Sequence, residues 1–318
     1  MSNSRTTFLA IFAFAAAALY GQSPTNSLPN PYRAVENWAT LPSNIHWSQV
    51  ISVMPDAKGN IWVFHRSEPA ILEFDATGKL IQSFGTGFVQ PHGLTVDHEG
   101  NVWVTDQSAK DGKGRQVWKF SPEGKLLMTL GKAGGGTGAE GFDAPCDVAI
   151  AANGDVFVAD GHGSETERVV KFSKDGKYIK AWGTKGSGPG QFDTLHRLAM
   201  DSKGRLYVAD RSNNRIQIFD QDGKFIDQWK QFGRPSGIYI SKGDTLYSVD
   251  SQSDEKVNSG FKRGIRIGSA KTGVVKYFIP DLSADPAIAL AEGITADSKG
   301  DLYAAGVSSM GLHKFVKK

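Results

Sequence analysis

The sequence predicts an all-β fold, a six-bladed β-propeller, and three observations support this prediction. A short frame returns six times along the 318 residues, and its copies lie about forty to fifty-five residues apart, which is the length of one propeller blade. Each copy places two runs of strand-forming residues on either side of a tight turn. The chain also contains 37 glycines, which suits a fold that turns often.

The repeated frame reads as strand, turn, strand, and the copy near residue 200 illustrates the whole blade. Leu198–Met200 is a short apolar strand, and Asp201–Gly204 is a hairpin turn whose glycine can adopt a positive φ. Leu206–Asp210 is rich in strand formers, Arg215–Phe219 alternates with period two, and Phe225–Trp229 follows another turn. Four antiparallel strands make one blade. The six copies of the frame are Val53–Val63, Leu94–Val104, Val148–Val158, Leu198–Val208, Ile238–Val249 and Ile294–Ala304.

The two ends of the chain are predicted to close the ring. After the last copy of the frame begins, the sequence offers three strands, at Ile294–Ala296, Leu302–Ala305 and Leu312–Val316. The segment Tyr32–Thr40 precedes the first blade and has no partner of its own. We therefore expect this N-terminal segment to supply the outer strand of the last blade, which removes an exposed sheet edge. An open solenoid is the alternative.

Residues 1–21 have the features of a signal peptide, and residues 22–318 are assigned to the propeller. Arg5 supplies a positive charge, and Phe8–Tyr20 is an apolar stretch too short to span a bilayer. Small residues precede a plausible cleavage point at Gly21–Gln22. We therefore expect an exported protein, periplasmic or secreted, with an uncleaved membrane anchor as the alternative. Cys146 is the only cysteine, so an intramolecular disulfide is impossible.

The charge distribution narrows the classes of partner. The formal net charge is +3, and the lysines and arginines are scattered along the chain rather than clustered. This pattern gives no support for binding nucleic acid or, once the signal peptide is removed, a membrane. We expect a small-molecule or peptide substrate and a monomeric protein.

One position of the repeat differs from blade to blade in a way that predicts a metal site. It lies two residues before the leading aliphatic residue of the first strand. His92, His196 and Glu292 occupy it on blades two, four and six, which are spaced by about a third of a turn around a six-fold ring. Two histidines and a carboxylate form a ligand set for a transition metal with positions left open for water or substrate. A single histidine at this position would instead be interpreted as a polar residue of a loop. The other blades carry Ile51, Cys146 and Ser236 at this position.

A second repeat position, just after the second strand, carries arginine on two blades. Arg66 and Arg211 are expected on the same face of the ring as the metal ligands, where each could clamp a carboxylate. A salt bridge between blades is the alternative. The residue before this position is aspartate on most blades, and these aspartates are predicted to accept hydrogen bonds from turn backbone. They are Asp106, Asp160, Asp210 and Asp250.

Several of these segments resemble the peptidyl-α-hydroxyglycine α-amidating lyase domain, an NHL-repeat propeller of six blades. The resemblance covers nearly the whole chain after the signal peptide. The general NHL-type elements are Gly188-Pro189-Gly190-Gln191-Phe192 and Ala209-Asp210-Arg211-Ser212-Asn213-Asn214-Arg215-Ile216. The other segments are Phe64-His65-Arg66, Gln90-Pro91-His92-Gly93-Leu94, Pro145-Cys146-Asp147-Val148-Ala149 and Leu195-His196-Arg197-Leu198-Ala199. The positions of His92, His196, Arg66 and Arg211 are the more specific part of the resemblance.

The resemblance implies roles for individual residues. The family binds zinc through three histidines, two of which match His92 and His196, while Glu292 stands at the position of the third. Arg66 and Arg211 match arginines that hold the substrate. The family's tyrosine base corresponds to His162, which we expect to act as general base.

Two departures from the family pattern affect the expected cofactors. A carboxylate in place of the third histidine widens the choice of metal from zinc, the first expectation, to iron or manganese. The family also has an aspartate after its third histidine that helps to hold a structural calcium, and here that position is Gly293, so the calcium is in doubt.

The leading functional hypothesis is a metal-dependent lyase that acts on a carboxylate-bearing α-hydroxy substrate. The alternative is a non-catalytic NHL-repeat module that binds an extracellular peptide, glycan or protein, for which the glycine-rich loop Gly131–Asp143 could serve. A calcium-dependent lactonase-like hydrolase ranks last, because the repeat position contains a single carboxylate, Glu292.

Overall fold

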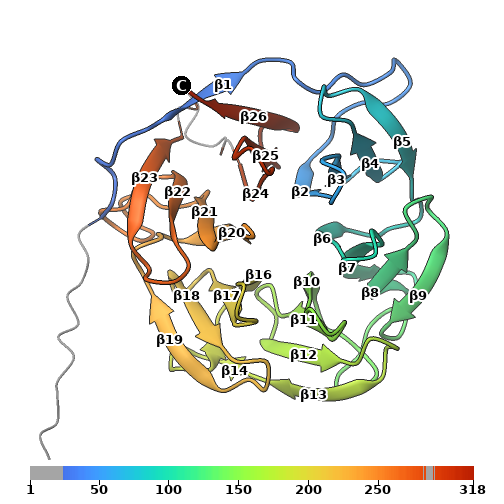
Figure 1. Cartoon of the computed structure of the whole chain (residues 1–318). Coiled ribbons are helices and arrows are strands. Elements are labelled where there is room, and N and C mark those ends of the chain that lie inside the picture. The colour runs from blue at the N-terminus through green and yellow to red at the C-terminus, as the bar shows by residue number, and fades with distance from the viewer. Residues whose placement is uncertain (1–23, 282, 284–288, 290) are drawn as a thin grey trace, which may run out of the picture.

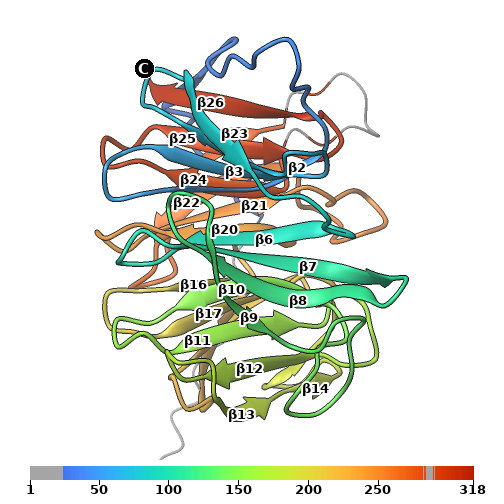
Figure 2. The same ribbon diagram turned by 90° about the vertical axis from the view of Figure 1, so that its right-hand side faces the viewer.

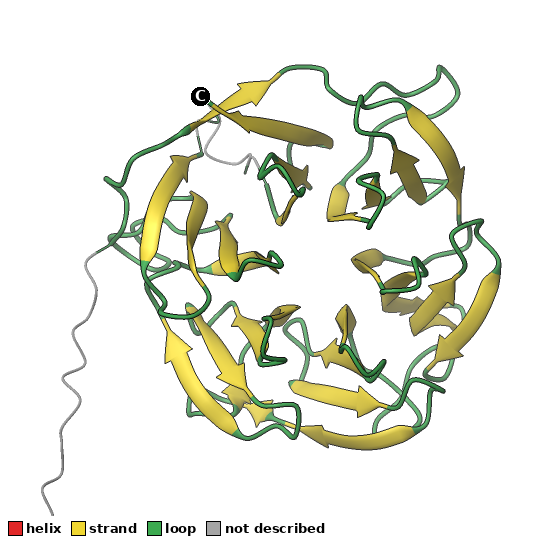
Figure 3. Cartoon of the chain, viewed as in Figure 1, coloured by secondary structure: helices red, strands yellow, loops and turns green. Residues whose placement is uncertain are grey.

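The computed structural model describes residues 24–281, 283, 289 and 291–318, and they form a closed ring of six four-stranded sheets (Figure 1). The predicted fold class is therefore confirmed. The described residues contain strands and loops but no helix (Figure 3), and accordingly none that is long and apolar enough to cross a membrane. The predicted signal peptide, residues 1–21, lies outside the described residues.

Each blade is an antiparallel sheet, and in blades one to five the strands run in chain order from the channel outward. Blade one contains β2 (Val50–Pro55), β3 (Ile61–His65), β4 (Ile71–Phe74) and β5 (Leu80–Phe84). Blade two contains β6 (Pro91–Val96), β7 (Val102–Lys110), β8 (Lys113–Phe120) and β9 (Leu126–Leu130). Blade three contains β10 (Pro145–Ile150), β11 (Val156–Asp160), β12 (Arg168–Phe172) and β13 (Tyr178–Trp182). Figure 2 views the ring from the side on which blade two lies.

The second half of the ring repeats this plan. Blade four contains β16 (Leu195–Met200), β17 (Leu206–Asp210), β18 (Arg215–Phe219) and β19 (Phe225–Trp229). Blade five contains β20 (Pro235–Ile240), β21 (Thr245–Asp250), β22 (Gly264–Ser269) and β23 (Val275–Pro280). Blade six contains β24 (Gly293–Ala296), β25 (Leu302–Gly306), β26 (Gly311–Lys317) and β1 (Tyr32–Val35). Between blades three and four, β14 (Thr184–Lys185) and β15 (Gln191–Phe192) form a short parallel pair.

The N-terminal segment closes the ring as predicted. β1 pairs antiparallel with β26, with Tyr32 opposite Lys317 (Figure 1). The Tyr32 side chain is buried, and its hydroxyl donates a hydrogen bond of 3.1 Å to the carbonyl of Gly300. The strand is shorter than the expected Tyr32–Thr40, because the chain turns directly after Val35 and Asn37 adopts a φ of 52°. This closure rules out the open solenoid.

Apolar side chains between neighbouring blades form the core. The cluster between blades three and four is typical, because Phe157 of β11 packs with Leu206 and Phe219 of the next blade. Side chains on the inner strands are almost fully buried, whereas those of outer strands such as β9 and β13 are half exposed. Each blade therefore depends on both neighbours to bury its two faces.

Candidate metal centre

A β-bulge in the inner strand of five blades explains why one repeat position stands apart. The strand register shifts at residues 50–52, 91–94, 145–147, 195–197 and 235–237. His92 and His196 lie within two of these bulges, and the equivalent residues on blades one, three and five are Ile51, Cys146 and Ser236. A bulged residue is left out of the ladder and its side chain is re-aimed. In blade six, Glu292 directly precedes β24.

Three histidines from three blades meet at one point. The ring centroids of His92 and His162 lie 4.7 Å apart, and each lies 4.8 Å from the ring of His196. One ligand nitrogen from each side chain lies within 4.8 Å of the other two. The structure therefore groups His92 and His196 as predicted, and it adds His162, which the sequence assigned to proton transfer.

The orientation of two of these rings suits a metal. The Nδ1 of His92 lies 2.7 Å from the carbonyl of Cys146, and the Nδ1 of His196 contacts the carbonyl of Ser236. A carbonyl only accepts hydrogen bonds, so each Nδ1 carries the proton and each Nε2 keeps its lone pair. Both Nε2 atoms are fully buried and have no hydrogen-bond partner among the described residues. Buried, unpartnered imidazole nitrogens that converge on one point fit a zinc site.

His162 reaches the cluster from a strained turn after β11. Its φ is 52°, which is unusual for a residue other than glycine, and its N–H donates to the carbonyl of Leu195 at 3.3 Å. Burial, followed by the charge of Arg211, lowers the pKa of His162 to about 4. Burial also holds the pKa of His92 and of His196 well below the usual value. All three rings are therefore neutral near pH 7, as metal ligands must be.

Glu292 lies beside the histidines but is held by an arginine. Its Oε1 is 3.4 Å from Nε2 of His196 and accepts a hydrogen bond of 3.1 Å from Nη1 of Arg211. Arg211 thus forms the salt bridge between blades that was the alternative to a substrate clamp. Arg66 donates instead to the side chain of Gln49 at 2.9 Å and to the carbonyl of Pro91 at 3.2 Å.

Glu167 fastens the turn that carries His162 to the strand that carries His196. Its carboxylate accepts three backbone N–H groups, from Gly163 at 3.0 Å, Thr194 at 3.0 Å and Leu195 at 2.8 Å. The residue is 1% exposed, and burial raises its pKa to about 6. Sequence reasoning missed Glu167, because it lies in the β11–β12 loop and outside the repeated frame.

The aspartates that recur after the second strand of the repeat have the structural role predicted for them. Asp160 accepts the N–H groups of Asp143 and Ala144, each at 2.8 Å, and Asp106 accepts those of Val89 and Gln90. Asp210 and Asp250 make the same kind of bond in their own blades. Each carboxylate anchors the backbone that leads into the inner strand, and so supports the bulge that follows it.

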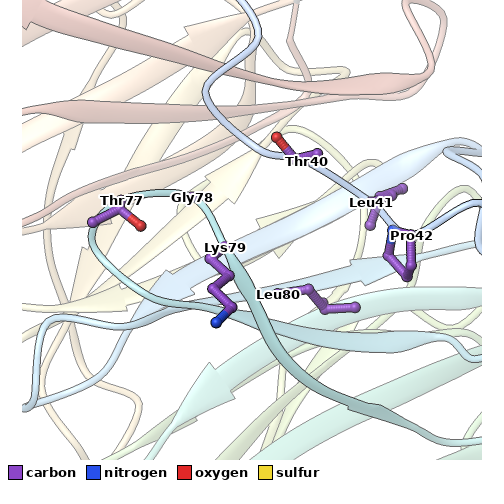
Figure 4. Close-up of a pocket in the computed structure, with 7 residues that line it drawn as sticks. All are labelled: Thr40, Leu41, Pro42, Thr77, Gly78, Lys79 and Leu80. Carbon is purple, nitrogen blue, oxygen red and sulfur yellow. The ribbon is translucent and has the colours of Figure 1, made fainter.

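A pocket on the outer rim is separate from the histidines. It lies between the N-terminal segment and the β4–β5 turn, and its lining includes Leu41, Lys79 and Leu80 (Figure 4). None of the predicted site residues lines this pocket. We therefore place the candidate site at the histidine cluster in the channel.

Comparison with known proteins supports the resemblance. Residues 192–219 match the family model described as NHL repeat. The chain is 33% identical over 313 residues to peptidyl-glycine alpha-amidating monooxygenase B of Xenopus laevis, covering 86% of this chain and 34% of that protein. It is 33% identical over 344 residues to peptidyl-alpha-hydroxyglycine alpha-amidating lyase 1 of Drosophila melanogaster, covering 92% of this chain and 61% of that protein. The chain thus spans less than two thirds of the length of either relative.

The solved structure of a streptogramin B lyase is also similar, with a TM-score of 0.59 at 16% identity, over 90% of this chain and 98% of that one. At that identity the likeness shows the fold alone. The chain is an NHL-repeat β-propeller of six blades that is similar in sequence to the peptidyl-α-hydroxyglycine α-amidating lyases.

Proposed function

We propose that this chain is a metal-dependent lyase whose divalent metal, zinc in the first instance, is held by His92, His162 and His196. The supporting observation is the triangle of imidazoles, buried for His92 and His196 and partly buried for His162, in which two Nε2 atoms lack a hydrogen-bond partner among the described residues. Three neutral histidines leave a tetrahedral ion one open position for substrate or water. The lyase-named relative of Drosophila melanogaster supports the reaction class.

In this proposal His162 and Glu292 exchange the roles expected from the sequence. A general base works best with a pKa near the operating pH, and a pKa of about 4 suits His162 better as a neutral ligand than as a base. Glu292 is already bonded to Arg211 and lies outside the group of mutually close ligand atoms. Its carboxylate is nevertheless 3.4 Å from Nε2 of His196, within reach of a substrate bound beside the metal.

The substrate class follows from the charged groups around the cluster. Arg66 and Arg211 supply positive charge for a substrate carboxylate, and a bidentate contact would orient the substrate. When the substrate carboxylate takes Arg211, Glu292 is released to accept the proton of the substrate hydroxyl. The C–O bond then becomes a carbonyl, the C–N bond breaks with its electron pair leaving on nitrogen, and the departing amide nitrogen takes up the proton that Glu292 had accepted. A bound divalent cation would polarise the substrate oxygen.

The test combines metal content with turnover. The wild-type protein is expected to contain zinc by elemental analysis, and to release an amide and glyoxylate from an N-acyl-α-hydroxyglycine. His92→Ala and His162→Ala should lose the metal, whereas Glu292→Gln should keep it and lose about 10²–10⁴-fold in kcat. His98→Ala is the matched control, because His98 is exposed on the β6–β7 turn of the same blade as His92.

Two results would redirect the proposal. If Glu292→Gln loses the metal and His162→Ala keeps it, the roles expected from the sequence are restored. If the wild-type protein holds no metal and His92→Ala changes nothing, the lyase hypothesis fails and the extracellular binding module takes its place. The expected export is tested separately, since the N-terminus of protein recovered outside the cytoplasm should begin near Gln22.

A further inference from the structure

Arg197 places a buried positive charge across the channel, next to the histidine cluster but not part of it. The residue follows His196 in β16 and is 4% exposed. Its guanidinium donates to Oδ1 of Asp147 at 3.1 Å and to Oγ of Ser52 at 3.2 Å. It also donates to the carbonyls of Ile51 and His92. These acceptors come from β2, β6 and β10, so one side chain of blade four ties together blades one, two and three.

The four acceptors share one chemical character. All are oxygens, from two carbonyls, a hydroxyl and a carboxylate, and such oxygens are the ligands that Ca²⁺ prefers. Both carbonyls belong to bulged residues, Ile51 and His92, which stand outside the strand ladder. The guanidinium therefore satisfies buried acceptors that would otherwise need another cation or a water.

A structural calcium does not fit this chain at that point. The resemblance would require a carboxylate after residue 292, and Gly293 supplies none. A Cβ at residue 293 would lie 2.8 Å from the carbonyl oxygen of Ile51, so a side chain would need the backbone to shift. That same carbonyl accepts a hydrogen bond from Arg197. The four oxygen acceptors and the cation that they surround, the Arg197 guanidinium, are thus all groups of the protein itself.

We propose that Arg197 is an internal cation that takes the place of a structural Ca²⁺ on the ring axis and positions the inner strands bearing His92 and His196. Asp147 is its counter-charge and also accepts a hydrogen bond from the N–H of Leu198 at 2.8 Å. The same carboxylate therefore holds both the guanidinium of Arg197 and the backbone next to it. The inference goes beyond the proposed lyase activity and would hold for a binding module as well.

The proposal predicts that calcium can replace the missing guanidinium. In chelator-treated buffer, wild-type protein should show the same melting temperature with and without millimolar Ca²⁺. Arg197→Ala should melt lower by on the order of 10 °C, because removing one partner of a buried pair leaves an uncompensated charge. Millimolar Ca²⁺, the range of weak extracellular sites, should restore at least half of that loss. Zinc affinity of the variant should weaken without calcium and recover with it.

The double variant Arg197→Ala with Asp147→Asn is the matched control. It retains the two carbonyls but lacks the carboxylate, so calcium should raise its melting temperature little. An equal calcium effect in the single and double variants would overturn the proposal, as would a calcium-dependent rise in the wild-type protein. If Arg197→Ala fails to accumulate, its refolding yield with and without calcium becomes the measurement, and equal yields would refute the proposal. Arg197→Lys, which keeps a cation, should remain insensitive to calcium.

Discussion

Replacing Glu167 with glutamine tests whether the β11–β12 loop is held by this one carboxylate. Glutamine has nearly the same shape, but one of its two terminal atoms becomes an NH₂ group that cannot accept a hydrogen bond. In the wild-type protein Oε1 accepts from Gly163 and Thr194, while Oε2 accepts from Leu195. Whichever way the amide is turned, at least one buried backbone N–H loses its acceptor and faces another donor.

The magnitude follows from that count. An unsatisfied buried donor costs about 1–3 kcal/mol. For a chain of this size the loss corresponds to a fall of about 5 °C in the melting temperature. Because the same carboxylate holds the turn of His162 and the start of β16, zinc binding should also weaken by about tenfold, as for other residues that orient metal ligands. Thermal unfolding and competitive zinc titration measure the two effects.

Glu165, two residues before Glu167, provides the control. Glu165 is exposed, and the one ion pair it forms with the residues that the structure describes is with Lys185 at 2.9 Å. Glu165→Gln should therefore change stability by less than about 0.5 kcal/mol. The reasoning is refuted if Glu167→Gln melts and binds zinc like the wild type, or if Glu165→Gln has an equal effect. Loss of stability with unchanged zinc affinity would confine Glu167 to a purely structural role.

Three further predictions follow from burial. In the metal-free protein, the free energy of unfolding should fall below pH 6.5. His92, His162 and His196 have folded-state pKa values depressed by burial, so each takes up a proton on unfolding; the slope approaches about 1.4 kcal/mol per pH unit per histidine in urea titrations. Tyr32→Ala should cost about 3–5 kcal/mol in the same assay, because this 4%-exposed ring closes blade six. Cys146, buried and with a raised thiol pKa, should react with a thiol reagent only after unfolding.

Most of the fold could be predicted because the repeat is local. Each hairpin turn carries its own signal, as at Asp201, whose carboxylate accepts the N–H groups of Lys203 and Arg205 while Gly204 adopts a φ of 74°. The same aspartate turn recurs in blades one, two and six, whereas blades three and five carry Ala151 and Ser241 at that position. The strand count and the ring closure by β1 therefore followed from the repeated frame as a whole. The end of β1 at Val35 was not predicted, since nothing in the apolar pattern of residues 32–40 marks the turn at Asn37.

The candidate site could be predicted in part. Alignment of the repeats found His92 and His196, because both occupy the bulge that the inner strands of blades one to five share. The same repeat position placed Glu292 among the ligands, and the family resemblance assigned His162 as the base. The structure instead groups His162 with the two other histidines and Glu292 with Arg211. The difference arises because both side chains leave loops or strand ends, whose direction depends on neighbouring blades rather than on the local sequence.

The bulges explain why this propeller can vary at the channel without losing its scaffold. A bulged residue contributes nothing to the strand ladder, so its side chain can change at little cost to the blade. Its carbonyl, however, needs a hydrogen-bond donor. The carbonyl of Cys146 accepts a hydrogen bond from His92, and the carbonyl of Ser236 accepts one from His196. The carbonyls of Ile51 and His92 both accept hydrogen bonds from Arg197. The two proposed metal ligands and Arg197 therefore satisfy the carbonyls of four bulged residues. Because backbone carbonyls leave no trace in a sequence, repeat comparison could find the histidines but not the reason that they and Arg197 must act together.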